Sequence, residues 1–283
     1  MKWRKLPAEE RRKAEAFLIE KEKLCVAASS RFLHIDENHG HVWYICSPEG
    51  KINSLLIQCR RILFPVFSEN AHITGPHFLN RLLGKVHVHA VQGLCRDAEL
   101  LETLMEDQGY FAAERIDYHL MSLDADLRPD AAIYKNRKSG PADLVIRKPD
   151  PKDEESLFNL QAAYEKEEVI PGNSVFNPAS CRLGLKRILS SEQVLVAELD
   201  GQVVGKINTS AESFTRFQIG GVYVRPDCRG MGIGIKMTEV FCESLLAQGK
   251  GLTLFVKKRN AAAVRVYHKA GFGILADYRI SYF

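Results

Sequence analysis

The most informative segment of this sequence is GGVYVRPDCRGMGIG, residues 220–234. A β-rich run leads into a loop with glycines at alternate positions, and a helix-forming stretch follows at once. Because glycine has no Cβ, the backbone amides at the start of that helix are open to phosphate oxygens, and the helix dipole adds to the attraction. We therefore expect a phosphate site at Gly230, Gly232 and Gly234. The spacing matches neither the Gly-x-Gly-x-x-Gly of dinucleotide-binding folds nor a P-loop, which argues against NAD and ATP.

A regular alternation of strands and helices surrounds this stretch. Asp200 and Gly201 supply the positive φ angles of a tight turn between two β-rich runs, which predicts a hairpin. Acidic residues after Pro151 favour the start of a helix. The order of elements predicts a mixed sheet flanked by helices. The expected strands are 144–146, 194–199, 202–207, 218–224, 252–256 and the C-terminal residues, and the expected helices are 153–168, 178–189, 232–248 and 261–270.

The first half carries a fainter version of the same pattern. Residues 41–46 and 51–57 are typical of two strands joined by a turn. Near the end of this half, AELLETLMEDQGY with ERIDYHLM resembles VRVYHKAGF with ADYRISY of the second half, so that Gly109 aligns with Gly271. We infer a diverged internal duplication, with chance similarity between two α/β halves as the alternative.

The boundary between the halves is marked by DADLRPDAAIYKNRKSGPAD, residues 124–143. This segment has two prolines, a glycine and few large apolar side chains, as linkers do. We predict one domain at 1–123, a linker at 124–142 and a second domain at 143–283.

Two motifs of the second half resemble those of the GNAT superfamily of acetyl-CoA-dependent N-acetyltransferases. The first, Arg/Gln-x-x-Gly-x-Gly/Ala, is matched by Arg229 to Gly234, directly after the expected strand. The resemblance covers about 143–283. It implies an α/β (α+β) fold with a mixed, mostly antiparallel sheet flanked by helices, preceded by a degenerate GNAT-like domain. The second motif, Asn-x-x-Ala-x-x-x-Tyr followed by Gly-Phe, is matched by Asn260, Ala263, Tyr267, Gly271 and Phe272.

The resemblance also implies where the cosubstrate acetyl-CoA binds. The pantetheine arm is expected to run beside a strand, with the Val222 amide as the donor to the charge that develops on the thioester oxygen. Consecutive Gly220 and Gly221 are consistent with a β-bulge that parts this strand from its neighbour. The residues expected to contact the arm are Val222, Tyr223 and Val224, and those expected to hold the pyrophosphate are Arg229, Gly230, Met231, Gly232, Ile233 and Gly234.

Catalytic roles follow from the same resemblance. Asn260 would bond the coenzyme arm, and Tyr267 would protonate the departing thiolate, since a phenol is still protonated at pH 7. The motifs do not identify the general base. Glu167, Glu168 and Glu212 are candidates, and we choose Glu168, which ends a helix next to the expected acceptor site. A solvated helix-end carboxylate is the competing interpretation.

These expectations describe a tandem-domain acyltransferase. The second half would transfer the acetyl group of acetyl-CoA directly to the primary amine of a small molecule or peptide. The alternative is a non-catalytic coenzyme A-binding sensor or interaction module. In the first half, Ala98 and Met105 align with Asn260 and Tyr267. We therefore expect that half not to bind the coenzyme, and instead to shape the acceptor pocket or mediate contacts between domains.

The distribution of charge favours an anionic ligand in the second half. The chain has a net charge of +4, but residues 225–269 hold nine Lys or Arg against three Asp or Glu, a local excess of +6. The alternative is a solvated basic face. No aromatic residues interleave the basic run at Lys257, Lys258 and Arg259, so coenzyme phosphates explain it better than a nucleic acid does.

Composition and residue spacing argue against a membrane protein, a secreted protein and a metal site. Apolar runs fall short of the ~18–20 residues that cross a bilayer, and the charged N-terminus does not resemble a secretory signal, so we expect a cytoplasmic protein with no membrane partner. Seven cysteines without Cys-x-x-Cys spacing argue against disulfides and zinc. His87 and His89 lack further ligand patterns, so we expect no metal. A homodimer stays an open expectation.

Overall fold

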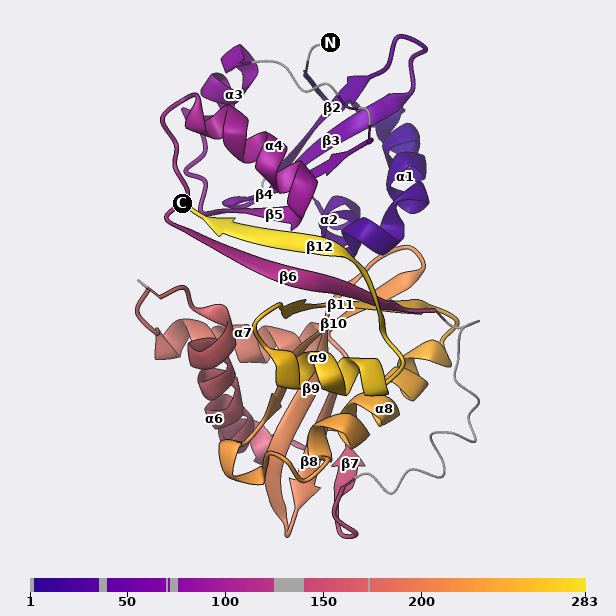
Figure 1. The fold of residues 1–283 in the computed structure, drawn as a ribbon, viewed down its shortest axis with the longest axis vertical. Coiled ribbons are helices and arrows are strands. Elements are labelled where there is room, and N and C mark those ends of the chain that lie inside the picture. Colours follow the sequence, from indigo (N-terminus) through magenta and orange to yellow (C-terminus); the bar gives the residue numbers. More distant parts are fainter. Residues whose placement is uncertain (1–2, 36–39, 70, 72–75, 125–139, 173) are drawn as a thin grey trace. The chain divides into compact units, whose positions relative to one another are not determined.

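A computed structural model describes residues 3–35, 40–69, 71, 76–124, 140–172 and 174–283 (Figure 1). The chain forms two compact units. Unit 1 consists of Met1–Leu120 and Leu275–Phe283, and unit 2 consists of Met121–Ile274. No helix among the described residues has the length and apolar character needed to cross a membrane.

Unit 1 is a sheet with helices on both faces. Its strand order is β1-β2-β3-β4-β5-β12-β6, with β4 and β5 parallel and the pairs from β1 to β4 antiparallel. The final residues of β6 belong to unit 2. The helices and strands of unit 1 are β1 (Arg4–Lys5), α1 (Arg11–Glu20), α2 (Glu22–Leu33), β2 (Gly40–Cys46), β3 (Ile52–Cys59), β4 (Ile62–Phe67), α3 (Pro76–Leu83), β5 (Ala90–Leu94), α4 (Cys95–Glu106), β6 (Glu114–Leu123) and β12 (Gly273–Tyr282).

The core of unit 1 explains why its helices form where they do. Leu56 and Leu63 of the sheet are buried against Leu79 of α3 and Leu101 of α4, and α1 and α2 cover the other face (Figure 1). Burial of such side chains is the main favourable contribution to folding. Ala98 and Met105 of α4 are fully buried in the same cluster.

The strand at the end of the chain lies largely in unit 1. Residues Tyr278 to Tyr282 of β12 pair with Leu94 to Ala90 of β5 in antiparallel register. The sequence prediction grouped 143–283 together, whereas the structure groups Leu275–Phe283 with unit 1 because β12 completes that sheet. Most of the expected linker, 125–139, lies outside the described residues. The domain boundaries stay a prediction.

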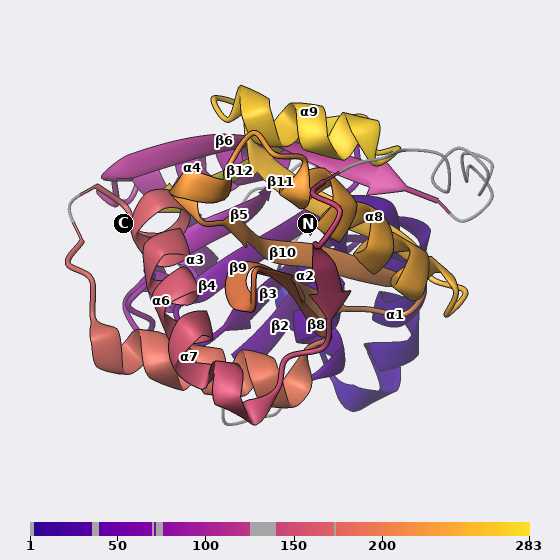
Figure 2. The same cartoon turned by 90° about the horizontal axis from the view of Figure 1, so that it is seen from below.

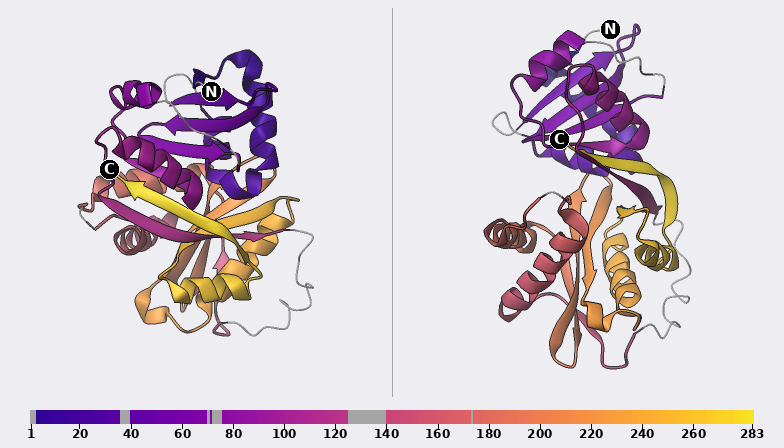
Figure 3. Two further views of the ribbon diagram at one scale, coloured as in Figure 1. Left: turned by 45° about the horizontal axis from the view of Figure 1, so that its top comes forward. Right: turned by 60° about the vertical axis from the view of Figure 1, so that its left-hand side comes forward.

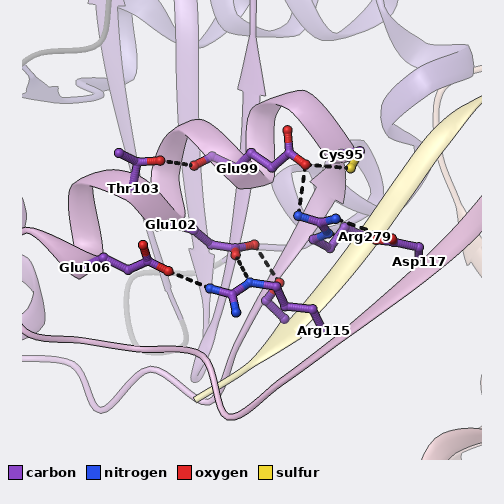
Figure 4. Close-up of polar contacts among 9 residues, drawn as sticks. Cys95, Glu99, Glu102, Thr103, Glu106, Arg115, Asp117 and Arg279 are labelled. Atoms are coloured by element: carbon purple, nitrogen blue, oxygen red, sulfur yellow. Dashed lines mark hydrogen bonds and ion pairs between the residues drawn. The ribbon is translucent and has the colours of Figure 1, made fainter.

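Ion pairs join β12 and β6 to α4 (Figure 4). Arg279 of β12 donates to Asp117 of β6 at 2.7 Å and to Glu99 of α4 at 3.0 Å. Arg115 of β6 donates to Glu102 and to a second glutamate of α4, both at 2.6 Å. Two arginines of the sheet therefore pair with three glutamates of α4 within unit 1.

The described part of unit 2 contains a sheet with helices on both of its faces. The strand order is β11-β10-β9-β8-β7, antiparallel from β10 to β7, with β10 and β11 parallel. Its elements are β7 (Val145–Arg147), α6 (Glu154–Tyr164), a π-helix (Glu165–Val169), α7 (Pro178–Ser191), β8 (Val194–Leu199), β9 (Gln202–Glu212), β10 (Arg216–Val224), α8 (Ile233–Leu246), β11 (Gly251–Lys257) and α9 (Ala261–Lys269).

The helices of unit 2 lie on opposite faces of its sheet. Helices α6 and α7 cover one face of β9 and β10, and α8 with α9 covers the other (Figure 2; Figure 3, right). Phe241 and Leu245 of α8 pack on Phe217 and Leu252 of the sheet in the core. The hairpin turn has positive φ at Asp200 and Gly201, as expected. The mixed, mostly antiparallel sheet flanked by helices is confirmed.

A bulge in β10 opens the sheet. Gly220 pairs with Asn208 of β9, but the next pair is Tyr223 with Lys206, so β10 contains one extra residue here. Gly221 has φ of +59°, which suits glycine. The ladder of β10 with β11 runs only to the pair of residues 219 and 254, although both strands continue. The bulge predicted from the two glycines is confirmed, and the strands part beyond it.

Candidate active site

A pocket of about 380 Å³ lies where β10 and β11 part, beside the starts of α8 and α9. Both sequence motifs contribute to its walls, although they lie some way apart in the sequence. Met231 is the one expected coenzyme contact that does not line it, and this residue is 45% exposed. The expected site residues that do line it are Glu168, Val222, Tyr223, Val224, Arg229, Gly230, Gly232, Ile233, Gly234, Asn260 and Tyr267.

Two glycines shape the backbone that leads into α8. Gly230 has φ of +81° and Gly232 of +83°, and Gly232 is the N-cap of the helix. A Cβ built on Gly230 meets no described atom within 4 Å, so backbone conformation rather than space selects glycine there. The first amides of α8 have no acceptor within the helix. They can therefore bind an anion at the positive end of the helix dipole.

Arg229 and Glu167 form an ion pair at the pocket wall. The guanidinium Nη1 and Nη2 lie 3.0 Å and 2.8 Å from the two carboxylate oxygens, and Arg229 Nε donates to the Val224 carbonyl at 3.0 Å. The hydroxyl of Tyr223 also donates to Glu167, at 3.2 Å. Arg229 holds the pKa of Glu167 below its ordinary value. Glu167 is therefore a charged partner of Arg229.

Glu168 contacts two side chains that come from β11 and the start of α9. Its Oε1 accepts from Asn260 Nδ2 at 3.0 Å, and its Oε2 lies 3.2 Å from Lys257 Nζ. Glu168 stands on the π-helix that extends α6, where the Ile170 amide donates to the Glu165 carbonyl at 2.8 Å. Such wide turns often occur at functional sites. Here consecutive glutamates both line the pocket.

Asn260 and Tyr267 approach the pocket from α9. Asn260 caps this helix, because its Oδ1 accepts from the Ala263 amide at 3.0 Å. Tyr267 is 8% exposed and packs on Phe272, with ring centroids 6.1 Å apart. Burial raises the pKa of Tyr267 above its ordinary value, so its phenol is protonated at neutral pH.

Glu212 lies elsewhere in unit 2. It ends β9, and its carboxylate is 2.6 Å from Lys250 Nζ. Its side chain is 55% exposed and is not part of the pocket wall. Of the three candidate bases, the structure brings Glu167 and Glu168 to the pocket.

Lys206 on β9 lies beside the site, although neither sequence motif indicates it. This residue is 1% exposed and lies beside the bulge, where its Nζ donates to the Gly221 carbonyl at 2.8 Å. Burial lowers the pKa of Lys206 to about 7. The available signal was its position in the strand run VVGKINTS, in step with buried Val204.

Sequence comparison identifies a family for unit 2. Residues 156–272 match the model of the acetyltransferase (GNAT) family. No curated protein matches the chain in sequence.

Solved structures resemble the whole chain at low sequence identity. A Drosophila protein superposes with a TM-score of 0.65 at 12% identity, covering 99% of this chain and 98% of that one. A tandem GNAT protein of the clavulanic acid biosynthesis pathway gives 0.63 at 12%, covering 99% and 97%. A GCN5-related N-acetyltransferase from Sphaerobacter thermophilus gives 0.61 at 18%, covering 99% and 94%.

These likenesses extend over both halves of the chain, which explains the faint repeat in its sequence. The chain therefore has the tandem GNAT fold, and its residues 156–272 form a domain of the GNAT acetyltransferase family.

Proposed function

We propose that unit 2 binds acetyl-CoA in the pocket between β10 and β11 and transfers the acetyl group to a primary amine of a small molecule or peptide. One observation carries this proposal. A single pocket is lined by the glycine-rich start of α8, by the strand edge from Val222 to Val224, and by Asn260 and Tyr267. GNAT membership supports an acyltransferase in general.

The pocket has the chemistry that the coenzyme requires. Free amides at the start of α8 suit a pyrophosphate, and Arg265 and Lys269 of α9 also line the pocket. The edge of β10 beyond the bulge can bond an extended amide chain as an added strand would. When bound, acetyl-CoA supplies an activated acetyl thioester.

Each catalytic residue then has one task. Glu168 accepts a proton from the attacking ammonium, directly or through water, so that the amine nitrogen can bond the acetyl carbon. The Val222 amide donates to the carbonyl oxygen as negative charge develops there. Tyr267 gives its proton to the sulfur when the carbon–sulfur bond breaks. The acetylated nitrogen then returns a proton to Tyr267, and Glu168 releases its proton to solvent. The products are an N-acetyl amine and coenzyme A.

The test combines binding with turnover. The full chain is titrated with coenzyme A by calorimetry, and acetyl-CoA with a labelled acetyl group is incubated with a library of primary amines and peptides. We expect binding and transfer of label to at least one acceptor. Tight binding without transfer to any acceptor would contradict the proposed reaction and support a coenzyme A sensor.

Substitution of Tyr267 separates the enzyme from the sensor. Tyr267→Phe removes the proton donor and keeps the ring, so kcat should fall by roughly 10²-fold or more while the Kd for coenzyme A stays within about twofold. Tyr110→Phe, at an exposed tyrosine of unit 1, is the matched control and should leave kcat unchanged. An unchanged kcat in Tyr267→Phe would rule out the assigned role.

A further inference from the structure

A buried lysine lies beside the bulge of β10. The ammonium of Lys206 donates to the Gly221 carbonyl oxygen at 2.8 Å and to Asn208 Oδ1 at 3.1 Å. The ring of Tyr164 on α6 is centred 5.0 Å from the same nitrogen. Asn208 Nδ2 in turn donates to the Thr209 carbonyl at 2.7 Å, which orients Oδ1 toward the lysine. Burial of an ammonium is unfavourable unless it is fully bonded, so its position next to the pocket requires an explanation.

The bond to Gly221 acts on the amide of the next residue. The Gly221 carbonyl and the Val222 N–H belong to one peptide group, and in a trans peptide they point in opposite directions. No cis peptide occurs in the described part of the chain. Lys206 therefore bonds one end of a peptide group whose N–H points away from it, and Val222 lines the pocket.

We propose that Lys206 is a positioning residue that polarises the Gly221–Val222 peptide and so strengthens the Val222 N–H as donor to the thioester oxygen. This inference rests on the proposed acetyl transfer. A charge-assisted bond to a carbonyl draws electron density through the amide and makes its N–H a better donor. The effect is larger in a water-excluded site than in water.

Gly221 fits this arrangement for a steric reason. A Cβ on Gly221 would lie 2.0 Å from Asn208 Oδ1 and 2.8 Å from Lys206 Nζ. Any side chain here would therefore displace the lysine or its partner. The conformation of the bulge at Gly221 and the position of the Lys206 ammonium therefore depend on each other.

The charge of Lys206 changes near neutral pH. Burial lowers its pKa to about 7, whereas the carboxylate of Glu165 and the sulfur of Cys181 act in the opposite direction. Burial raises the pKa of Cys181 to about 11 and also raises that of Tyr223, the cross-strand neighbour of Lys206, so both side chains are neutral at pH 7. The ring of Tyr164 is centred 5.0 Å from the ammonium. The polarising charge is present below about pH 7 and is lost above it.

The first test needs no acceptor amine. Acetyl-CoA labelled with ¹³C at the acetyl carbonyl is bound to the full chain, and the carbonyl stretch is recorded by isotope-edited infrared spectroscopy. We expect a lower frequency in the wild type than in Lys206→Met, because a stronger donor weakens the C=O bond. Lys206→Gln keeps a neutral donor and should lie between them. It also keeps the test valid should Lys206→Met fail to fold. Lys250→Met, outside the pocket, is the matched control and should equal the wild type.

The second test is the pH dependence of the same band. In the wild type the frequency should rise between pH 6 and pH 9 as Lys206 loses its proton, and in Lys206→Met it should stay constant. A purely structural role for the lysine would give no such titration. With an amine that is acetylated, Lys206→Met should lower kcat at pH 6 about tenfold, less than the 10²–10³ of removing an oxyanion donor outright, with the Kd for coenzyme A within about twofold.

The outcomes separate the two proposals. Absence of acetyl-CoA binding to the wild type would overturn the proposed function and this inference with it. Binding and transfer with the same carbonyl frequency in the wild type, Lys206→Met and Lys206→Gln would overturn only the role of Lys206.

Discussion

Asn260 serves both the helix and the site. Its Oδ1 caps α9 and its Nδ2 donates to Glu168, so both ends of the amide are in use. The sequence motif predicted only a contact with the coenzyme, and that contact stays a prediction. The geometry adds that Asn260 links the start of α9 to the π-helix carrying Glu168.

Glu168 and Glu212 make a matched pair of substitutions. Both carboxylates lie near a lysine, but only Glu168 lines the pocket. Glu168→Gln should lower kcat by about 10²-fold, the lower end of the range for a general base. Glu212→Gln should stay within about twofold of the wild type. Steady-state measurement of kcat with acetyl-CoA and an accepted amine tests this. A larger loss of kcat in Glu212→Gln than in Glu168→Gln would identify Glu212 as the general base.

Lys206 should also leave a signature in the stability of the protein. Its pKa is about 7 in the folded chain and about 10.4 when unfolded. Between these values the unfolded chain binds a proton that the folded chain lacks, so stability rises with pH. Relative to Lys206→Met, the unfolding equilibrium constant of the wild type should fall by up to about tenfold per pH unit from pH 7 to 9 and should be flat below pH 7.

Urea unfolding at pH 6, 7, 8 and 9 measures this difference, because titrations shared by both proteins cancel. Lys250→Met, which removes a partly exposed lysine, should show no such slope. A wild-type curve parallel to that of Lys206→Met at every pH would mean that the lysine keeps its ordinary pKa.

At the scale of the element, the bulge of β10 combines backbone conformation with close packing. Gly221 and Gly249 both have positive φ, +59° and +77°, but only Gly221 has atoms in the way of a Cβ. The same substitution at the two sites therefore separates the cost of conformation from the cost of contact.

Gly221→Ala should lower the free energy of unfolding by roughly 3 kcal/mol or more, since backbone strain adds to a clash with Asn208. Gly249→Ala should cost only about 1–2 kcal/mol, the cost of the left-handed conformation. Chemical denaturation compares them. Equal losses would show that the bulge relaxes around the new methyl group, and coenzyme binding should then be unchanged as well.

At the scale of the whole molecule, the chain end contributes a strand to the unit formed by the chain start. Arg279 of β12 is bonded to Asp117 and Glu99, and its side chain is 15% exposed. Both tryptophans of the chain, Trp3 and Trp43, pack in the core of the same unit. Tryptophan fluorescence therefore reports on unit 1.

Arg279→Met should lower the urea midpoint of the fluorescence transition by a small amount, because two partly exposed carboxylates lose a shared partner, at a cost of about 1 kcal/mol. Lys13→Met, which removes an exposed partner of Glu10, should leave the midpoint unchanged. A shortened chain that ends at Ile274 should lose more stability than Arg279→Met. An unchanged midpoint in that chain would show that β12 is dispensable to unit 1.

The sequence alone predicted the elements of unit 2 and most of the expected coenzyme contacts that line its pocket. Local patterns suffice to predict these elements and motifs. Apolar alternation, glycines at positive φ and each of the two motifs depend on residues that are close together in the sequence. Tertiary structure decided that β12 joins unit 1, that Glu168 contacts Lys257, and that Lys206 is buried under the bulge. Those features depend on which strand pairs with which and on where the sheet opens, and such long-range choices leave no local pattern in the sequence.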